Sequence, residues 1–255
     1  MRTKNRTAGH RSSCRETPPN RGGKRTGRWT LVQLSGAAVG PDVVAPALEE
    51  VLAAIPADLD WAALSDRVVP VFPRVRQHPS GSPAPLQMVV PPGLSISFGV
   101  DLGPAFLAVT RDMLATWALT PADVLATALA NLERRASSIS PDDIVRESID
   151  GTPVRLLQSG TGSGASFVLL PGELGRLFGS SQQLLIAPMR DLLIALPLDA
   201  DRDMVAELFD LVASQDPNSI APIAFLFRDG RVTLDALVPG LDPARLQPAQ
   251  PGPFH

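Results

Sequence analysis

The clearest strand pattern lies at residues 94–100, where large apolar positions alternate with small polar ones. The stretch LSISFGV places its four large apolar residues on one face and serine or glycine on the other. This period of two predicts a β-strand with one buried face. The apolar stretches 86–90 and 105–109 predict two more strands, and the DLGP sequence before the second predicts a hairpin turn.

The clearest helix pattern spans residues 120–136, with the sequence TPADVLATALANLERRA. Thr120 suits the N-cap, Pro121 suits the first helical position, and Asp123 is placed to complete a capping box. The spacing of the apolar residues that follow predicts one buried face. That apolar stripe consists of Leu125, Ala128, Leu129 and Leu132.

Asn131 lies beside this stripe, seven residues after Val124 and therefore on the same helix face. If that face is buried, the amide must find hydrogen-bond partners. Two interpretations stay open. Asn131 contacts a ligand, or it fastens a neighbouring backbone segment, and we favour the second because it needs no bound molecule.

The stretch LLIAPMRDLLIALPL, residues 184–198, contains two aliphatic runs around a short polar turn. Runs with apolar residues on both faces predict central strands that are covered on both sides. The PMRD sequence predicts the hairpin turn, where Asp191 can accept hydrogen bonds from nearby backbone N–H groups. The alternative is a binding role, since Arg190 can make planar contacts with a carboxylate or phosphate.

The second half of the chain predicts further hairpins. Strands are expected at 154–158 and 165–170, joined by the loop SGTGSG at 159–164. Its glycines do not match a phosphate-binding pattern, because a strand rather than a helix is expected to follow them. The remaining expected elements are a strand at 29–36, a helix at 41–55, a helical turn or two at 171–179, a helix at 199–215 and an Asp-Gly hairpin at 223–237.

These elements predict an α+β fold in which antiparallel β-hairpins pack against a few amphipathic helices. Two similarly built subdomains, 29–136 and 150–240, are compatible with the order of the elements, with a junction at 137–149. Residues 1–28 and 241–255 are expected to be a disordered basic arm and a disordered proline-rich tail. Apolar residues make up 44% of the chain, which favours a globular body.

Charge divides the chain into a basic arm and an acidic body. Residues 1–28 carry a formal charge of +8, and the rest of the chain carries −11. The arm has no apolar segment of the secretory kind, and no apolar run approaches the ~20 residues of a membrane span. We therefore expect no membrane span and a cytoplasmic protein. The arm could contact nucleic acid or anionic lipid, but we favour a solvated, disordered tail or an over-extended gene start.

The body contains few of the residues that catalyse reactions. Both lysines, the single cysteine and two of the three histidines lie in the terminal tails, and there is no tyrosine. The remaining histidine, His78, lies in a proline-rich loop. A lysine Schiff base, a phosphate-loop lysine and a His/Cys zinc site are therefore not expected, and the sequence implies no metal and no cofactor. Catalysis would depend on carboxylates, arginine or hydroxyl groups.

Several segments, in chain order, resemble a family of uncharacterised bacterial proteins, the YtpQ-like family. They are SISFGVDLGPAFLAVTRDMLATWALTPADVLATALANL, GASFVLLPGEL and LLIAPMRDLLIALPL, within residues 60–240. The resemblance implies special positions for Asp101, for Asn131 and for the Arg190–Asp191 turn. It supports the fold and the cytoplasmic location, and it implies no activity because the family has none established.

Two classes of function follow. We favour a non-enzymatic binding or interaction protein with a protein or small-molecule partner, because the body has so little catalytic equipment. The candidate binding residues are Asp101, Asn131, Arg190 and Asp191. The alternative is a hydrolase-like enzyme that uses carboxylates and arginine, which requires Asp101, Arg190 and Asp191 to converge in one cleft.

Overall fold

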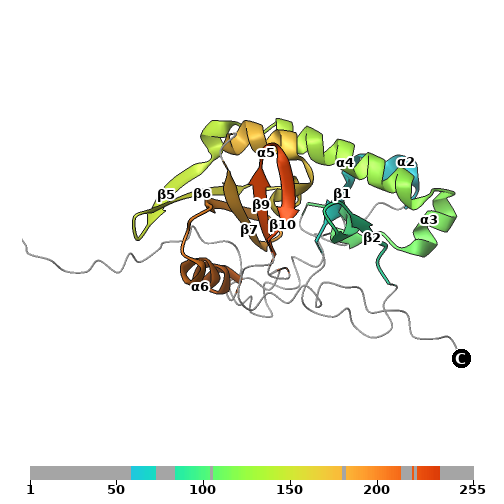
Figure 1. The fold of residues 1–255 in the computed structure, drawn as a ribbon. Coiled ribbons are helices and arrows are strands. Elements are labelled where there is room, and N and C mark those ends of the chain that lie inside the picture. Colours follow the sequence, from blue (N-terminus) through green and yellow to red (C-terminus); the bar gives the residue numbers. More distant parts are fainter. Residues whose placement is uncertain are drawn as a thin grey trace, which may run out of the picture. The chain divides into compact units, whose positions relative to one another are not determined.

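The computed structural model describes one compact unit of the chain (Figure 1). The described residues are 59–72, 84–103, 106–179, 182–213, 220 and 223–235. The predicted arm at 1–28, the strand at 29–36, the helix at 41–55 and the tail at 241–255 lie outside these residues, as does His78.

The first sheet is antiparallel and is built around strand β3, Leu94–Asp101. β1, Val68–Val71, pairs with one edge of β3. β2, Gln87–Val90, and β4, Phe106–Ala108, follow one another along the other edge. The three strands and the hairpin predicted here are confirmed, but the single buried face predicted for β3 is wrong, because its residues 96–100 are buried on both faces. β1 was missed, because its proline-containing sequence VVPV does not alternate.

The helices of the first half run from α2, Trp61–Leu64, to α4, Pro121–Ser137. Between them, α3 spans Arg111–Trp117 and was not predicted. Thr120 and Asp123 form the predicted capping box, in which each side chain accepts a hydrogen bond from the other residue's backbone N–H. α4 packs against β1, so its buried stripe covers the first sheet.

The second sheet has six antiparallel strands in the order β10-β9-β7-β8-β6-β5. Its strands are β5 Val145–Ile149, β6 Thr152–Gln158, β7 Gln183–Met189, β8 Leu192–Pro197, β9 Ala224–Arg228 and β10 Arg231–Leu234. The predicted Asp-Gly turn joins β9 to β10, with positive φ at Asp229 and Gly230 as a two-residue hairpin turn requires. β5 lies inside the predicted junction 137–149, where its exposed side chains gave no apolar pattern.

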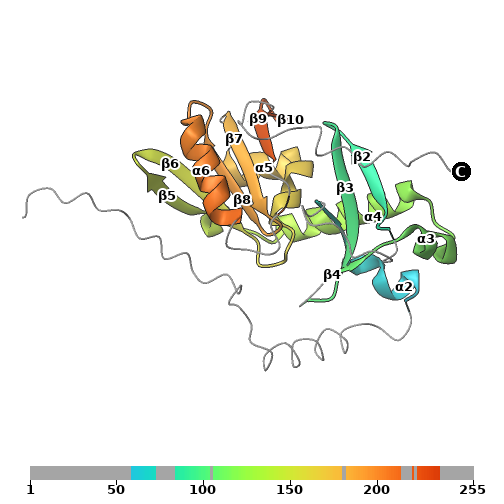
Figure 2. The same ribbon diagram turned by 90° about the horizontal axis from the view of Figure 1, so that it is seen from below.

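β7 and β8 are the central strands of this sheet, as their aliphatic sequences predict. Nearly all of their residues are buried. Helix α6, Arg202–Ala213, lies on one side of the sheet, and helix α5, Pro171–Phe178, lies on the other (Figures 1 and 2). A strand needs apolar residues on both faces only when both faces are covered, which explains the sequence.

The strand predicted at 165–170 is wrong. These residues form a 3-10 helix, η3, at Gly164–Leu169, which continues almost directly into α5. The backbone N–H groups of Ser166 and Leu170 donate to carbonyls three residues earlier, as a helical turn requires. A short continuous apolar run has the same composition in a buried strand and in a buried helical turn, so periodicity could not separate them.

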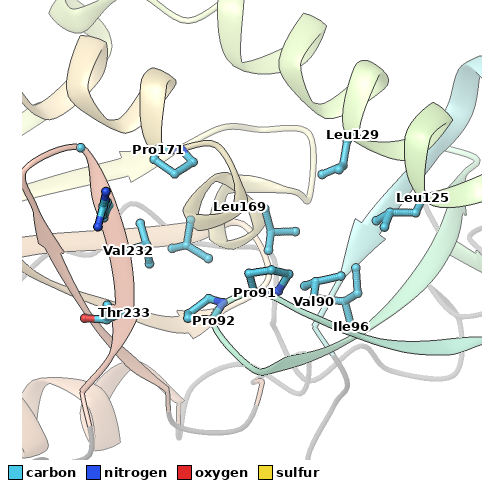
Figure 3. Close-up of a pocket in the computed structure, with 13 residues that line it drawn as sticks. Val90, Pro91, Pro92, Ile96, Leu125, Leu129, Leu169, Pro171, Val232 and Thr233 are labelled. Atoms are coloured by element: carbon cyan, nitrogen blue, oxygen red, sulfur yellow. The ribbon is translucent and has the colours of Figure 1, made fainter. Parts of the chain in front are cut away.

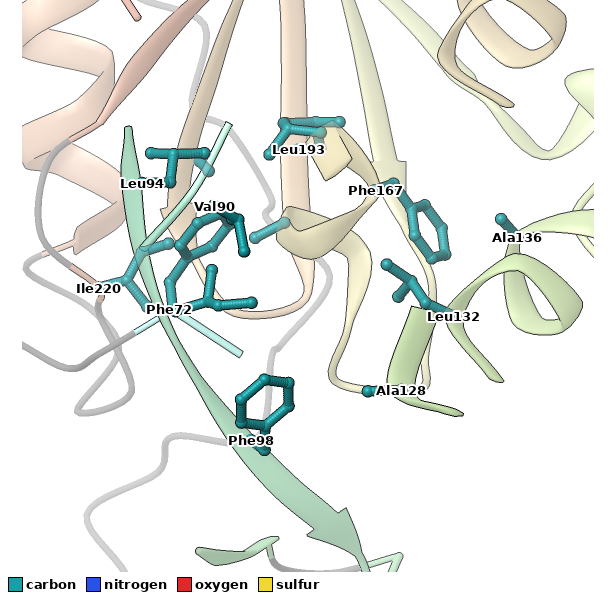
Figure 4. Close-up of a cluster of buried hydrophobic side chains, with 14 of the residues drawn as sticks. Phe72, Val90, Leu94, Phe98, Ala128, Leu132, Ala136, Phe167, Leu193 and Ile220 are labelled. Atoms are coloured by element: carbon teal, nitrogen blue, oxygen red, sulfur yellow. The ribbon is translucent and has the colours of Figure 1, made fainter. Parts of the chain in front are cut away.

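One hydrophobic core connects both sheets. It includes Phe98 of β3, Leu132 of α4, Phe167 of η3 and Leu193 of β8 (Figure 4). The Ser166 hydroxyl in η3 donates a hydrogen bond of 2.7 Å to the backbone oxygen of Pro70 in β1. The α+β class with hairpins packed against amphipathic helices is thereby confirmed, while the similarity of two subdomains stays a prediction.

The helices of the described residues differ from membrane spans in length or in composition. No single one of these helices has both the length and the apolar composition to cross a membrane. α3 and α4 meet that standard only as a pair, and they are bent by 96° relative to each other.

Asp123 provides a pH-dependent test of the capping box. Hydrogen bonds from the hydroxyl and then from the backbone N–H of Thr120 lower the pKa of Asp123. Because the folded pKa is the lower one, the stabilisation is complete above the unfolded pKa of about 3.9 and is lost as the pH falls through the folded pKa. We expect Asp123→Asn to be less stable than the wild type at pH 7, with the difference shrinking in strong acid, as measured by urea unfolding.

Asp112 supplies the control for this test, because it also lies in the first turn of a helix, α3. The cap of that helix is a bond to Thr110, so Asp112→Asn should show a smaller change in stability with pH. Equal pH profiles for the two variants would show that the helix dipole, rather than the capping box, accounts for the effect.

Candidate functional site

Asp191 lies in the two-residue turn between β7 and β8 and binds a loop that is distant in sequence. Its carboxylate accepts hydrogen bonds from the hydroxyl of Ser159, from the N–H of Gly160 at 2.8 Å and from the N–H of Gly164 at 3.4 Å. The carboxylate therefore does more than stabilise its own turn. It fixes the loop 159–164 onto the end of the β7–β8 hairpin.

Hydroxyl groups order the same loop from within. The hydroxyls of Ser159 and Thr161 lie 2.8 Å apart, and those of Thr161 and Ser163 lie 2.7 Å apart. Ser163 is fully buried. The hydroxyl groups of the serines and the threonine thus form hydrogen bonds with one another and with Asp191. Hydroxyl groups can act in catalysis, but here these bonds order the loop.

Arg190 packs on an aromatic ring from the first sheet. Its guanidinium carbon lies 4.5 Å from the ring centroid of Phe106 in β4, within the range of a cation–π interaction. Gly162 also adjoins this ring, because a Cβ at that position would lie 2.8 Å from a ring carbon of Phe106. The glycine-rich loop is therefore needed for close packing against Phe106. No phosphate is required to explain its composition.

Asp101, at the end of β3, connects the first sheet to α4. Its carboxylate forms an ion pair of 2.7 Å with Arg135 and accepts a hydrogen bond of 2.8 Å from the N–H of Gly103. Arg135 also donates to the backbone oxygen of Thr161 at 3.3 Å. Asp101, Arg190 and Asp191 are therefore all linked to the loop 159–164. They gather around it through contacts that stabilise the fold.

Asn131 lies apart from this loop and fastens the start of the first sheet. Its amide nitrogen donates to the backbone oxygens of Ser65 at 2.7 Å and Val68 at 2.8 Å. Its oxygen accepts a hydrogen bond of 2.9 Å from Arg134. The side chain is 3% exposed, so these bonds explain its burial. Ligand roles for Asn131 and for the three loop-contacting residues stay predictions.

The sequence did not reveal an apolar groove of about 440 Å³ (Figure 3). We define the groove by its lining residues Val90, Pro91, Pro92, Ile96, Leu125, Leu129, Val168, Leu169, Pro171, Gly230, Arg231, Val232 and Thr233. They come from the first sheet, α4, the η3–α5 segment and the β9–β10 hairpin. Leu125 and Leu129 were predicted to belong to the apolar stripe on α4, and Ile96 to the buried face of β3. For Leu125 and Leu129 the structure gives a further role. They are half-buried at the groove, whereas Ala128 and Leu132 of the same stripe are fully buried.

A second hollow of about 430 Å³ lies at the β9–β10 hairpin. Its lining consists of Leu226, Arg228, Asp229, Arg231 and Thr233. Arg231 and Thr233 of β10 therefore border both hollows. Asp101, Arg190 and Asp191 line neither of them, so the cleft that the enzyme hypothesis requires is not found at these two hollows.

The chain has no match in three comparisons with known proteins, made with family models, with curated proteins and with solved structures. Within the described part of the chain, no group of three or more His, Cys, Asp or Glu residues is gathered as metal ligands would be.

Asp191→Ala tests whether Asp191 serves the fold. The substitution leaves the N–H groups of Gly160 and Gly164 without their acceptor, which we expect to cost about 2 kcal/mol of unfolding free energy. Asp199→Ala, at an exposed position near the end of β8, should stay within about 0.5 kcal/mol of the wild type. Unchanged stability of Asp191→Ala, measured by chemical denaturation, would assign Asp191 a role outside the fold.

Proposed function

We propose that this protein is a non-enzymatic binding protein that holds an apolar side chain of a partner protein in the groove. The observation that carries the proposal is the groove itself. Apolar side chains from four separate parts of the fold converge there on a space of about 440 Å³. A space of this size is typical of recognition sites, in which apolar walls provide affinity and a few polar groups provide orientation.

The contacts of the polar candidates also favour recognition over catalysis. The carboxylate of Asp191 is hydrogen-bonded to the loop 159–164. The carboxylate of Asp101 is ion-paired with Arg135 and hydrogen-bonded to the N–H of Gly103. A general base must reach the proton that it abstracts, and a nucleophilic hydroxyl must be adjacent to a base that is aimed at substrate. Ser159 contacts Asp191, but the same carboxylate also binds two backbone N–H groups. This arrangement supports a structural role for the cluster.

A protein partner fits the groove better than a small molecule does. The hairpin strand β10 forms one wall, so the main chain of that strand lies beside the apolar surface. Arg231 is the only charged residue among the described lining residues, and it lies at this wall. An apolar side chain that projects from a partner's backbone can occupy the groove while its main chain lies along the hairpin. The resemblance to the YtpQ-like family stays a prediction, as does the cytoplasmic location. Neither implies an activity for this protein.

Leu129→Gln tests the groove with an uncharged apolar probe, N-phenyl-1-naphthylamine. Leu129 lines the groove from α4, and glutamine keeps the helix propensity of the position. We expect the variant to bind the probe about tenfold more weakly, because the loss of part of a buried leucine surface costs about 1.4 kcal/mol. The measurement is a fluorescence titration of the full chain.

Ala130→Gln is the matched control, because Ala130 is the next residue of α4 and is exposed. It should bind the probe as the wild type does. The proposal is contradicted if the Leu129→Gln variant is folded and binds the probe with unchanged affinity, or if the wild type does not bind the probe at all.

A further inference from the structure

Strand β10 forms an open edge of the six-stranded sheet. In the described part of the chain, β10 pairs only with β9. A two-residue turn joins these strands, so the flanking residues Arg228 and Arg231 form a hydrogen-bonded pair. Bonded and non-bonded pairs then alternate along the ladder. The N–H and C=O groups of Val232 and Leu234 consequently point away from the sheet, toward the open edge.

The two hollows lie on opposite faces of this edge. Val232 pairs with Phe227, which belongs to the hydrophobic core, and its side chain lines the groove. Side chains alternate along a strand, so the side chains of Arg231 and Thr233 project to the face opposite that of Val232, where they line the second hollow, while both residues also border the groove. A strand added along β10 would therefore direct successive side chains alternately into the groove and into the second hollow.

The charge of the second hollow favours an acidic partner. Arg228 and Arg231 are directly opposite each other on neighbouring strands, and like charges in such pairs repel. The ion pairs found among the described residues involve neither of them. Among the described lining residues, Asp229 is the only acid, so these residues together carry a net positive charge. A carboxylate opposite Arg231 would relieve the repulsion and could accept bidentate hydrogen bonds.

We propose that β10 accepts an extended segment of a partner protein as a seventh strand, in which apolar residues that enter the groove alternate with acidic residues that face Arg228 and Arg231. This inference rests on the proposed function and adds the binding mode and the partner's sequence pattern. Main-chain hydrogen bonds to Val232 and Leu234 would supply affinity, and the alternating hollows would supply specificity.

A second copy of this chain is a less suitable occupant than an acidic segment. Pairing of β10 with the β10 of another copy would add a second pair of arginines to an edge of only four residues. Charged residues on an edge strand are a common means of preventing such self-pairing. The same charges attract an acidic strand, so the arginines would distinguish the partner from the chain itself.

The probe is a fluorescein-labelled heptapeptide of alternating glutamate and valine, and its binding to the full chain is followed by fluorescence anisotropy. Val232→Pro removes the N–H that points to the open edge while leaving the β9 ladder in place. We expect it to weaken binding at least tenfold. Val232→Ala, which keeps the N–H, should lose less affinity than Val232→Pro.

A charge reversal tests the second half of the proposal. The double variant with Arg228→Glu and Arg231→Glu should no longer bind the glutamate–valine peptide. It should bind a lysine–valine peptide with at least tenfold higher affinity than the wild type does. Arg146→Glu is the matched control. Arg146 of β5 is also directly opposite an arginine, Arg155 of the neighbouring strand β6, but at the other edge of the sheet. Burial and the charge of Arg146 lower the pKa of Arg155. This control should leave peptide binding unchanged.

The outcomes separate this inference from the proposed function. If the chain binds N-phenyl-1-naphthylamine but not the peptide, strand addition is wrong and the groove proposal stands. If it binds neither, both fail. Equal affinity for the alternating peptide and for one with its valines and glutamates in separate blocks would also contradict strand addition. A dimer that Val232→Pro dissociates, without peptide binding by the wild type, would identify a second copy as the occupant.

Discussion

The packing of η3 between the two sheets is the interaction on which the rest of the structure depends. Ala165, Ser166 and Phe167 are at most 1% exposed, so three consecutive side chains are buried in three directions. The hydroxyl of Ser166 binds the first sheet at Pro70, and the N–H of Ala165 binds the carbonyl of Arg190 in the second. A strand could bury only alternate residues against each sheet, whereas a tight helical turn fills the space between them and produces one core.

The same segment shapes the groove. Val168 is the last buried residue of η3 and lines the groove. Leu169 follows it and lies between Pro91 and Val232 in the groove (Figure 3). The groove is therefore a product of how the sheets are joined, and its walls are held by the core. A preformed site spends little binding energy on ordering itself. The polar cluster around the loop 159–164 supports this arrangement, because Asp191 fixes the segment that leads into η3.

The sequence predicts those elements that are determined by interactions between residues close together in the chain. The strand at β3, the Thr120–Asp123 capping box and the Asp229–Gly230 turn each require only neighbouring residues, and all are present. The second buried face of β3 was not predicted, because its small residues are covered by elements distant in sequence. β5 was not predicted, because its exposed residues carry no apolar pattern. The Asp-Gly sequence at Asp150 and Gly151, which have positive φ in the structure, could have indicated a hairpin turn after it. Asp101, Arg190 and Asp191 were singled out from the sequence, and their site role stays a prediction. Their links to one loop, which for Asp101 run through Arg135, depend on tertiary structure. The groove could not be predicted, because its walls come from segments up to about 140 residues apart.

Residue-resolved amide hydrogen exchange tests the central claim most directly, namely that β10 and the groove form one recognition surface. In the free protein, the N–H groups of Val232 and Leu234 should exchange quickly, while those of Arg231 and Thr233 are protected by the ladder with β9. Saturation with the glutamate–valine peptide should slow exchange at Val232 and Leu234. Binding that leaves both amides in fast exchange, with protection appearing elsewhere on the chain, would contradict the account.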